Sequence, residues 1–318
     1  MAKKRAGKAK PAKLVSAKGA SSRVRKANKR QSKKLAKKEA LNRTKMPNSF
    51  RLVGQVYQIF RVNWRILLGV VIVYLILNVI FASGFGTISS SISSIKNNLE
   101  TSGQLSGALA GFSTLVGSAG SNSSQTGSIL QSLLIVIESL VIIWALRQIL
   151  AGKAITVKEA YYRSMTPFIP FLLVVAVIII QLLPVVLGSA IAGTVLSVIF
   201  NSSATMTLVF TIIFILLASW SIYLLSSSIF AVYIVTLPDM EPLKALRSAK
   251  NLVHYRRWPL LRRLLFLPIF ILLVMAVICV PLILYATFLV APVFYFLSMV
   301  AILFIHTYLY SLYRSLLE

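Results

Sequence analysis

Residues 236–285 read TLPDMEPLKALRSAKNLVHYRRWPLLRRLLFLPIFILLVMAVICVPLILY, and this stretch decides the fold class. From position 264 onward it is continuously apolar, and a helix needs about 20 apolar residues to cross a hydrocarbon core about 30 Å thick. The part before position 264 is short and rich in Lys and Arg. Apolar runs separated by basic gaps are typical of helical membrane proteins, whose cytoplasmic loops carry an excess of Lys and Arg.

Similar apolar runs recur along the chain. We predict six membrane-spanning helices, at about 66–85, 129–149, 168–187 (or as far as 196), 208–235, 264–285 and 288–309. Continuous runs favour helices over the alternating strands of a membrane β-barrel. The composition agrees, since 57% of the residues are hydrophobic, 13% are charged and the mean hydropathy is +0.82. We therefore predict an all-α, polytopic membrane protein with two further helices at the cytoplasmic interface.

The distribution of charge predicts the topology. The chain carries 34 Lys and Arg against seven Asp and Glu, a net charge of +27, and the segments at 147–167 and 236–263 hold much of the basic content outside the N-terminus. Three segments on the opposite side contain a single basic residue, Lys96: 86–128, 197–206 and the turn near Ala286. The positive-inside rule then places both termini in the cytoplasm. We expect a multi-pass protein of the bacterial inner (plasma) membrane.

Two domains follow from this pattern. Residues 1–48 are Lys-rich, with almost no aromatic or β-branched content, so we expect a disordered polybasic cytoplasmic tail. Residues 49–318 form the six-span membrane domain, and apolar residues at helical spacing within 49–65 predict an interfacial helix that leads into the first span. Contact of residues 1–45 with RNA or the ribosome is one hypothesis for the tail.

The segment 86–128 is rich in Ser and Gly and allows two interpretations. Gly103, Gly107 and Gly111 recur at every fourth position, a spacing that lets helices approach closely in a membrane. The apolar part is too short to span, so it predicts either a surface or re-entrant helix, or a flexible loop of linker-like composition.

Each inner loop contains a predicted short helix. In the first, Thr156 and Glu159 form a capping box, so a helix should begin at Val157, and Pro167 should end it. In the second, Asp239 and Glu241 precede Pro242, a favourable helix start.

The second of these helices is predicted to be amphipathic and to lie on the inner leaflet, with its cations reaching lipid phosphates. The predicted apolar stripe consists of Leu246, Ala249 and Val253. The predicted basic stripe consists of Arg247, Lys250, His254 and Arg257, and the inner-leaflet phosphate contacts are expected from Arg247, Lys250, Arg256 and Arg257.

The segments DMEPLKALRS at 239–248, RRW at 256–258 and KEAYYR at 158–163 resemble motifs of a known family. They are similar to the bacterial YciC-type integral membrane proteins, and to the membrane domain that precedes the catalytic domain in some glycerophosphoryl diester phosphodiesterases. The resemblance covers roughly residues 50–315 and implies a six-span architecture rather than a chemistry. Because we find no phosphodiesterase catalytic domain after the spans, we do not expect esterase activity.

Glu138 is the most informative single residue, because an acid in the middle of a span is costly and marks a functional site by default. Gln181 in the third span lies at about the same depth. One hypothesis is structural: a protonated Glu138 hydrogen-bonds to Gln181 or to a serine. The alternative is a proton or cation path through Glu138.

Other polar or unusual residues in the spans favour structural roles. We predict that His306 is a core or interface histidine, that Cys279 is a core residue, and that the span prolines kink their helices. The span serines, Ser219, Ser221 and 226–228, should bond to backbone carbonyls or pack at helix contacts. We find no catalytic motif and no metal-ligand or cofactor motif in the sequence.

Three functional hypotheses remain. The first is a non-enzymatic membrane protein that organises anionic lipid or a partner at the inner leaflet. The second is a transporter or permease-like component that uses Glu138. The third is an insertase or ribosome-docking protein whose tail binds RNA phosphates. A membrane-protein partner or a homo-oligomer is compatible with each of them.

Overall fold

The computed structural model describes residues 47–82, 104–118, 125–199, 203–238, 240–254 and 256–317. All regular secondary structure in these residues is helical, and six of the helices are long and apolar enough to cross a membrane. The prediction of an all-α, multi-pass membrane protein is confirmed. The predicted tail lies outside the described residues, apart from positions 47 and 48. The helices are α2 (Ser49–Ala82), α4 (Gln104–Ser118), α5 (Gln125–Leu150), α6 (Val157–Ser164), α7 (Phe168–Ile199), α8 (Ser203–Ser228), α9 (Ala231–Ile234), α10 (Pro242–Val253), α11 (Arg257–Tyr285) and α12 (Thr287–Leu317).

The predicted interfacial helix and the first span are one helix, α2, with a break inside it. Asn63 leaves helical geometry, with φ −116° and ψ 26°. Its side-chain amide donates a hydrogen bond to the Ile59 carbonyl at 3.3 Å. The break lies two residues before the predicted junction, so a change in helix direction separates the amphipathic segment from the apolar one.

The fourth predicted span is confirmed, as Ala204–Ile234, and a short irregular segment interrupts its helix. α8 ends at Ser228, and the short α9 follows after Ile229 and Phe230. Hydroxyls near the break bond to carbonyls three residues back: Ser226 to Tyr223 O at 2.8 Å, and Ser227 to Leu224 O at 2.7 Å. Such bonds compete with the backbone ladder and bend helices, which gives a physical reason for the division.

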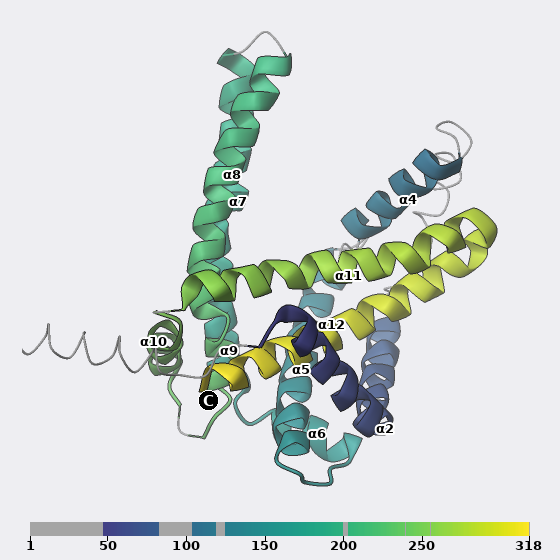
Figure 1. Cartoon of the computed structure of the whole chain (residues 1–318), viewed down its shortest axis with the longest axis vertical. Coiled ribbons are helices and arrows are strands. Elements are labelled where there is room, and N and C mark those ends of the chain that lie inside the picture. The colour runs from purple at the N-terminus through teal and green to yellow at the C-terminus, as the bar shows by residue number, and fades with distance from the viewer. Residues whose placement is uncertain are drawn as a thin grey trace, which may run out of the picture. The chain divides into compact units, whose positions relative to one another are not determined.

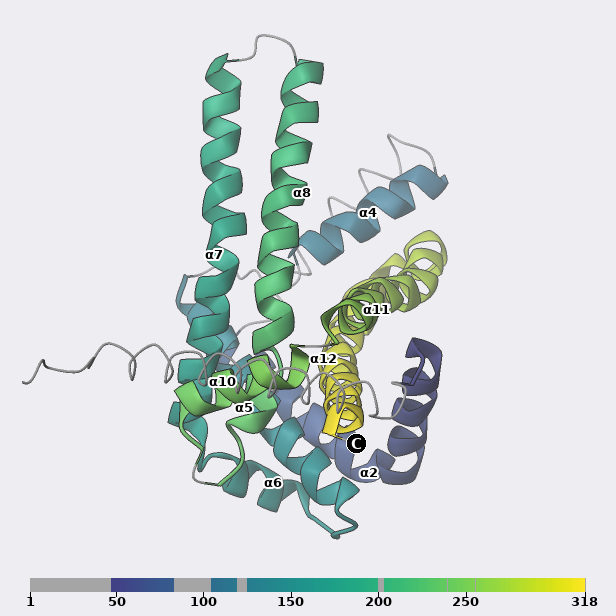
Figure 2. The ribbon, with the colours of Figure 1, turned by 60° about the vertical axis from the view of Figure 1, so that its left-hand side comes forward.

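α7 and α8 lie side by side over most of their length (Figures 1 and 2). A Cβ added at Gly188 would lie 2.7 Å from a methyl of Leu217, so glycine permits the close approach. Ser221 adds an interhelix bond, because its hydroxyl donates to the Gln181 carbonyl at 3.0 Å. α7 and α11 continue through their internal prolines, as does α12.

The other spans pack around α5 and α12. α2 contacts both of these helices, and α11 packs along α12 (Figure 1). The segment for which the sequence left two alternatives contains a helix, α4, which packs on α11. Ala108 and Leu115 of α4 are fully buried in the same hydrophobic cluster as Cys279. Cys279 is therefore a core residue, as predicted.

Candidate functional site

The partner of the buried acid is a tyrosine from a helix outside the spans. Glu138 of α5 is only 1% exposed, and its Oε2 accepts a hydrogen bond from the Tyr161 hydroxyl of α6 at 2.7 Å. The same hydroxyl lies 3.1 Å from the Val70 carbonyl of α2. α6 can approach α2 so closely because position 69 is glycine: a Cβ there would lie 2.7 Å from a methyl of Val157.

The hydrogen-bond count suits a neutral carboxyl. Tyr161 has one hydroxyl proton and two acceptors within reach, and Oε1 of Glu138 is buried with no hydrogen-bond partner among the described residues. No described cation forms an ion pair with Glu138. If the carboxyl carries a proton, it donates to Tyr161 and Tyr161 donates to Val70, so both hydroxyl protons have an acceptor. An unpaired buried carboxylate would be far more costly.

Neither of the partners predicted for Glu138, Gln181 or a serine, forms a hydrogen bond with it among the described residues. Gln181 lies in α7, which packs mainly against α8, and its side-chain oxygen is buried with no hydrogen-bond partner among the described residues. The sequence analysis missed Tyr161. Its neighbour Tyr162 is 83% exposed, so the rotation of α6 decides which tyrosine meets the acid.

A second set of buried polar groups joins α2 to α12. The Tyr295 hydroxyl donates to Oδ1 of Asn78 at 2.6 Å, and the Asn78 amide lies 3.5 Å from the Tyr74 hydroxyl. All three residues are at most 2% exposed. Val70, Tyr74 and Asn78 follow one another at four-residue intervals, so one stripe of α2 carries every polar group that the helix contributes here.

α5 holds a third polar connection through Ser139, next to Glu138. Nε2 of His306 lies 3.0 Å from the Ser139 hydroxyl, and Nδ1 lies 3.3 Å from the Tyr233 hydroxyl. Ser139 donates its own proton to the Ile135 carbonyl at 2.7 Å. The Nε2–H tautomer therefore satisfies the chain: Tyr233 donates to His306, and His306 donates to Ser139. The predicted interface role of His306 agrees with this geometry.

Arg147, in the last turn of α5, contacts the segment that follows α9. Its Nη1 donates to the Thr236 carbonyl at 2.7 Å, and its Nη2 lies 3.4 Å from the Tyr233 carbonyl and also bonds to the Thr236 hydroxyl. These carbonyls belong to the C-terminal end of α9, where backbone acceptors lack helical partners and positive charge is favourable. The last turn of α5 thus holds the start of the loop that contains α10.

The start of each predicted loop helix is confirmed. The Thr156 hydroxyl accepts a hydrogen bond from the Glu159 amide at 3.3 Å, and α6 begins at Val157. α10 begins at Pro242. Glu241 pairs with Lys244 at 3.1 Å instead of capping α10, and Asp239 lies outside the described residues.

The basic residues expected to contact phosphate divide into two groups. Arg247 and Lys250 are exposed on α10, and the buried stripe opposite them consists of Ala245, Ala249 and Val253. Leu246, predicted to lie in that stripe, is only half-buried.

Arg256 and Arg257 form the second group, at the turn into α11, and both are half-buried. Arg257 does not continue the basic stripe of α10, because that helix ends at Val253. Its guanidinium instead lies 4.6 Å from the centre of the Tyr223 ring. The exposed His254 lies directly after α10.

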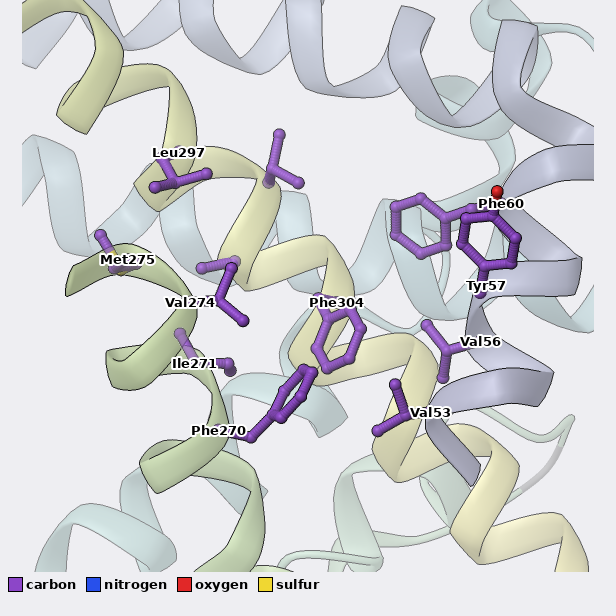
Figure 3. Close-up of a pocket in the computed structure, with 12 residues that line it drawn as sticks. Val53, Val56, Tyr57, Phe60, Phe270, Ile271, Val274, Met275, Leu297 and Phe304 are labelled. Atoms are coloured by element: carbon purple, nitrogen blue, oxygen red, sulfur yellow. The ribbon is translucent and has the colours of Figure 1, made fainter. Parts of the chain in front are cut away.

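An apolar cavity of about 410 Å³ lies between the first part of α2 and the facing sides of α11 and α12 (Figure 3). Phe60, Phe270 and Phe304 form part of its wall, and the Phe270 and Phe304 rings stack with centres 5.7 Å apart. Such a lining offers dispersion contacts to hydrocarbon and almost no hydrogen bonds. Among the described residues no cluster of potential metal ligands is found.

No protein-family model, curated protein or solved structure matches this chain.

Proposed function

We propose that this chain is a membrane protein that binds and organises anionic lipid at the inner leaflet of a bacterial plasma membrane, with α10 as the contact element. The observation that carries the proposal is that α10 has one buried apolar face and exposed cations outside that face. Its small side chains, Ala245, Ala249 and Val253, are fully buried. Arg247 and Lys250 are exposed and form no ion pair with a described residue.

Exposed apolar side chains flank these cations. Leu243 at the start of α10 is 73% exposed, and Trp258 at the start of α11 is 70% exposed. Tryptophan is enriched at membrane interfaces, where its ring meets the headgroup region. Each basic side chain near an anionic surface contributes about 1 kcal/mol to the binding free energy. The basic residues of α10 and of the turn after it therefore contribute several kcal/mol together.

The apolar cavity between α2, α11 and α12 supports lipid as the bound class. The side chains that line it give hydrocarbon a surface and give a polar solute almost no hydrogen-bond partners. The cavity is lined by the part of α2 that the sequence assigns to the membrane interface.

The test is lipid enrichment around the full chain. The protein is captured in lipid nanodiscs from a mixture of phosphatidylglycerol and phosphatidylcholine, and the retained lipid is quantified by mass spectrometry. We expect enrichment of phosphatidylglycerol over the bulk ratio, a lower enrichment for the Arg247→Gln/Lys250→Gln variant, and loss of the effect at high salt.

The matched control is the Arg247→Lys/Lys250→Arg variant, which keeps both charges and should keep the enrichment. Equal retention of the two lipids by the unmodified chain would overturn the proposal. So would equal enrichment in the charge-neutral and charge-retaining variants.

The buried acid favours a second candidate, a transporter that uses Glu138. Oε1 of Glu138 has no hydrogen-bond partner among the described residues and could receive a proton or cation. Glu138→Gln keeps the size of the side chain and an oxygen acceptor for Tyr161, but it cannot titrate. A host phenotype that depends on this chain and is lost in Glu138→Gln at unchanged abundance would support transport. An unchanged phenotype ends this candidate.

A further inference from the structure

A large cavity of about 800 Å³ lies where the two inner loops meet. Its walls come from the end of α5, from the end of α6 through the start of α7, and from the segment after α9 through the first residue of α10. The polar lining includes Arg147, Gln148 and Arg163. Trp144 and the prolines at 167, 170 and 238 supply an apolar wall beside these donors.

Arg147 is a fixed cation in this cavity. The side chain is half-buried, and three hydrogen bonds to Thr236 and Tyr233 hold its guanidinium in place. A guanidinium has five N–H donors, so donors remain for a ligand. No described acid pairs with Arg147. A pre-positioned donor loses little entropy when an anion binds.

The neighbouring side chains can join Arg147. Gln148 follows it on α5, and its side-chain amide makes no hydrogen bond with a described residue. Arg163 is exposed and pairs with Glu159 at 3.2 Å, and exposed pairs of this kind are weak. Glu241, the acid that lines the cavity, already pairs with Lys244 at 3.1 Å.

We propose that this cavity binds the phosphate group of an anionic phosphate ester, held by Arg147, Arg163 and Gln148. Arginine suits phosphate because its planar donors match the phosphate oxygens. The same chemistry is offered by a phospholipid headgroup and by a soluble ester such as glycerol 3-phosphate. The apolar wall of Trp144 and prolines suits the less polar part of either ligand. This inference rests on the proposed lipid-binding function and assigns it a second, defined site apart from the exposed α10 cations Arg247 and Lys250.

The experiment is native mass spectrometry of the full chain in mild detergent. Phosphatidylglycerol, phosphatidylcholine, glycerol 3-phosphate and inorganic phosphate are titrated separately. The test variants are Arg163→Gln, which removes an exposed cation, and Gln148→Glu, which adds an acid to the cavity. Arg314→Gln in the last turn of α12 is the matched control, because it removes an exposed arginine outside this cavity.

We expect one molecule of phosphate ester to bind the unmodified chain. Each test variant should weaken this binding about tenfold, and the control should leave the binding unchanged. Arg147 is left intact because it holds α9. If the test variants weaken the binding of phosphatidylglycerol alone, the ligand is a lipid headgroup. If they weaken the binding of glycerol 3-phosphate as well, the recognised element is the phosphate group itself.

Binding that is equal in the test variants and the unmodified chain would overturn the inference, as would equal weakening by the control. The Arg247→Gln/Lys250→Gln variant separates this failure from failure of the proposed function. If that variant lowers phosphatidylglycerol enrichment in nanodiscs while Arg163→Gln and Gln148→Glu change nothing, the α10 contact stands and the cavity site falls. Suppose instead that the unmodified chain shows no preference for phosphatidylglycerol but binds glycerol 3-phosphate, and that the cavity variants weaken this binding. The cavity site then stands and the α10 contact falls.

Discussion

The Tyr161 hydroxyl lies 2.7 Å from Oε2 of Glu138, so a helix outside the spans provides the hydrogen-bond partner of an acid inside one. The contact ties α6 to α5, and the Val70 carbonyl brings α2 to the same hydroxyl. Three helices, α2, α5 and α6, therefore meet at the Tyr161 hydroxyl.

Replacing Tyr161 by phenylalanine should destabilise the protein. The change removes the hydrogen bond and leaves Glu138 without a partner, which costs about 1–3 kcal/mol for a buried polar group. Thermal unfolding in detergent would measure the loss. Tyr162→Phe is the control from the same helix, and because Tyr162 is 83% exposed it should unfold like the unmodified chain. Equal midpoints for the two variants would refute the structural role of the contact.

The stability that Tyr161 provides should decrease at high pH. Burial, followed by the neighbouring Glu138, raises the pKa of Tyr161 above its ordinary value. In the unfolded chain tyrosine loses its proton near pH 10. In the folded chain Tyr161 keeps the proton, so stability is full below about pH 10 and falls as the pH rises further. The difference in unfolding midpoint between the unmodified chain and Tyr161→Phe should therefore narrow between about pH 9 and 11. A constant difference would contradict this.

Arg147→Gln should loosen the segment between α9 and α10. The substitution removes three hydrogen bonds to Thr236 and Tyr233, each worth about 1.5–3 kcal/mol when the donor is charged and buried but less at a half-exposed site. Faster amide hydrogen exchange in residues 235–246 would report the change. Arg147→Lys should give an intermediate rate, because an ammonium lacks the planar fork of donors. Exchange as slow as in the unmodified chain would show that the segment is held by other contacts.

The orientation of the chain can be tested with single cysteines. Cys279 is fully buried and should give little background. We expect a membrane-impermeant maleimide to label Tyr285→Cys in intact spheroplasts, since Tyr285 is 90% exposed and lies at the predicted outer turn. Lys250→Cys should react only after permeabilisation. Labelling of Lys250→Cys in intact spheroplasts would reverse the topology and remove the inner-leaflet proposals with it.

The sequence was sufficient for the number and approximate position of the spans, because span length and hydropathy are local properties. It was not sufficient for the break after Ser228. The run 208–235 is apolar throughout, so its hydropathy marks no break, although serine hydroxyls bond to backbone carbonyls just before it. The choice between loop and helix for α4 likewise depended on contacts with α11, which the sequence does not contain.

The site was predictable only where a single residue was informative without its neighbours. Glu138 was evident, because an acid within an apolar run is costly wherever its neighbours lie. The partner of Glu138 was not evident. Equal depth in the membrane suggested Gln181, but depth does not say which helices pack against each other. Asn78 could have been found by the reasoning that singled out Glu138, because it also interrupts an apolar run and is fully buried.

The bonds between Arg147 and the end of α9 couple the last turn of α5 to the segment that leads into α10. Glu138 lies nine residues before Arg147 on α5, about 13.5 Å along the helix axis at about 1.5 Å per residue. A displacement of α10 would act first on Thr236 and Arg147, and Arg147 lies on the same helix as the acid. One continuous helix thus links the buried acid to the segment that precedes the exposed cations of α10.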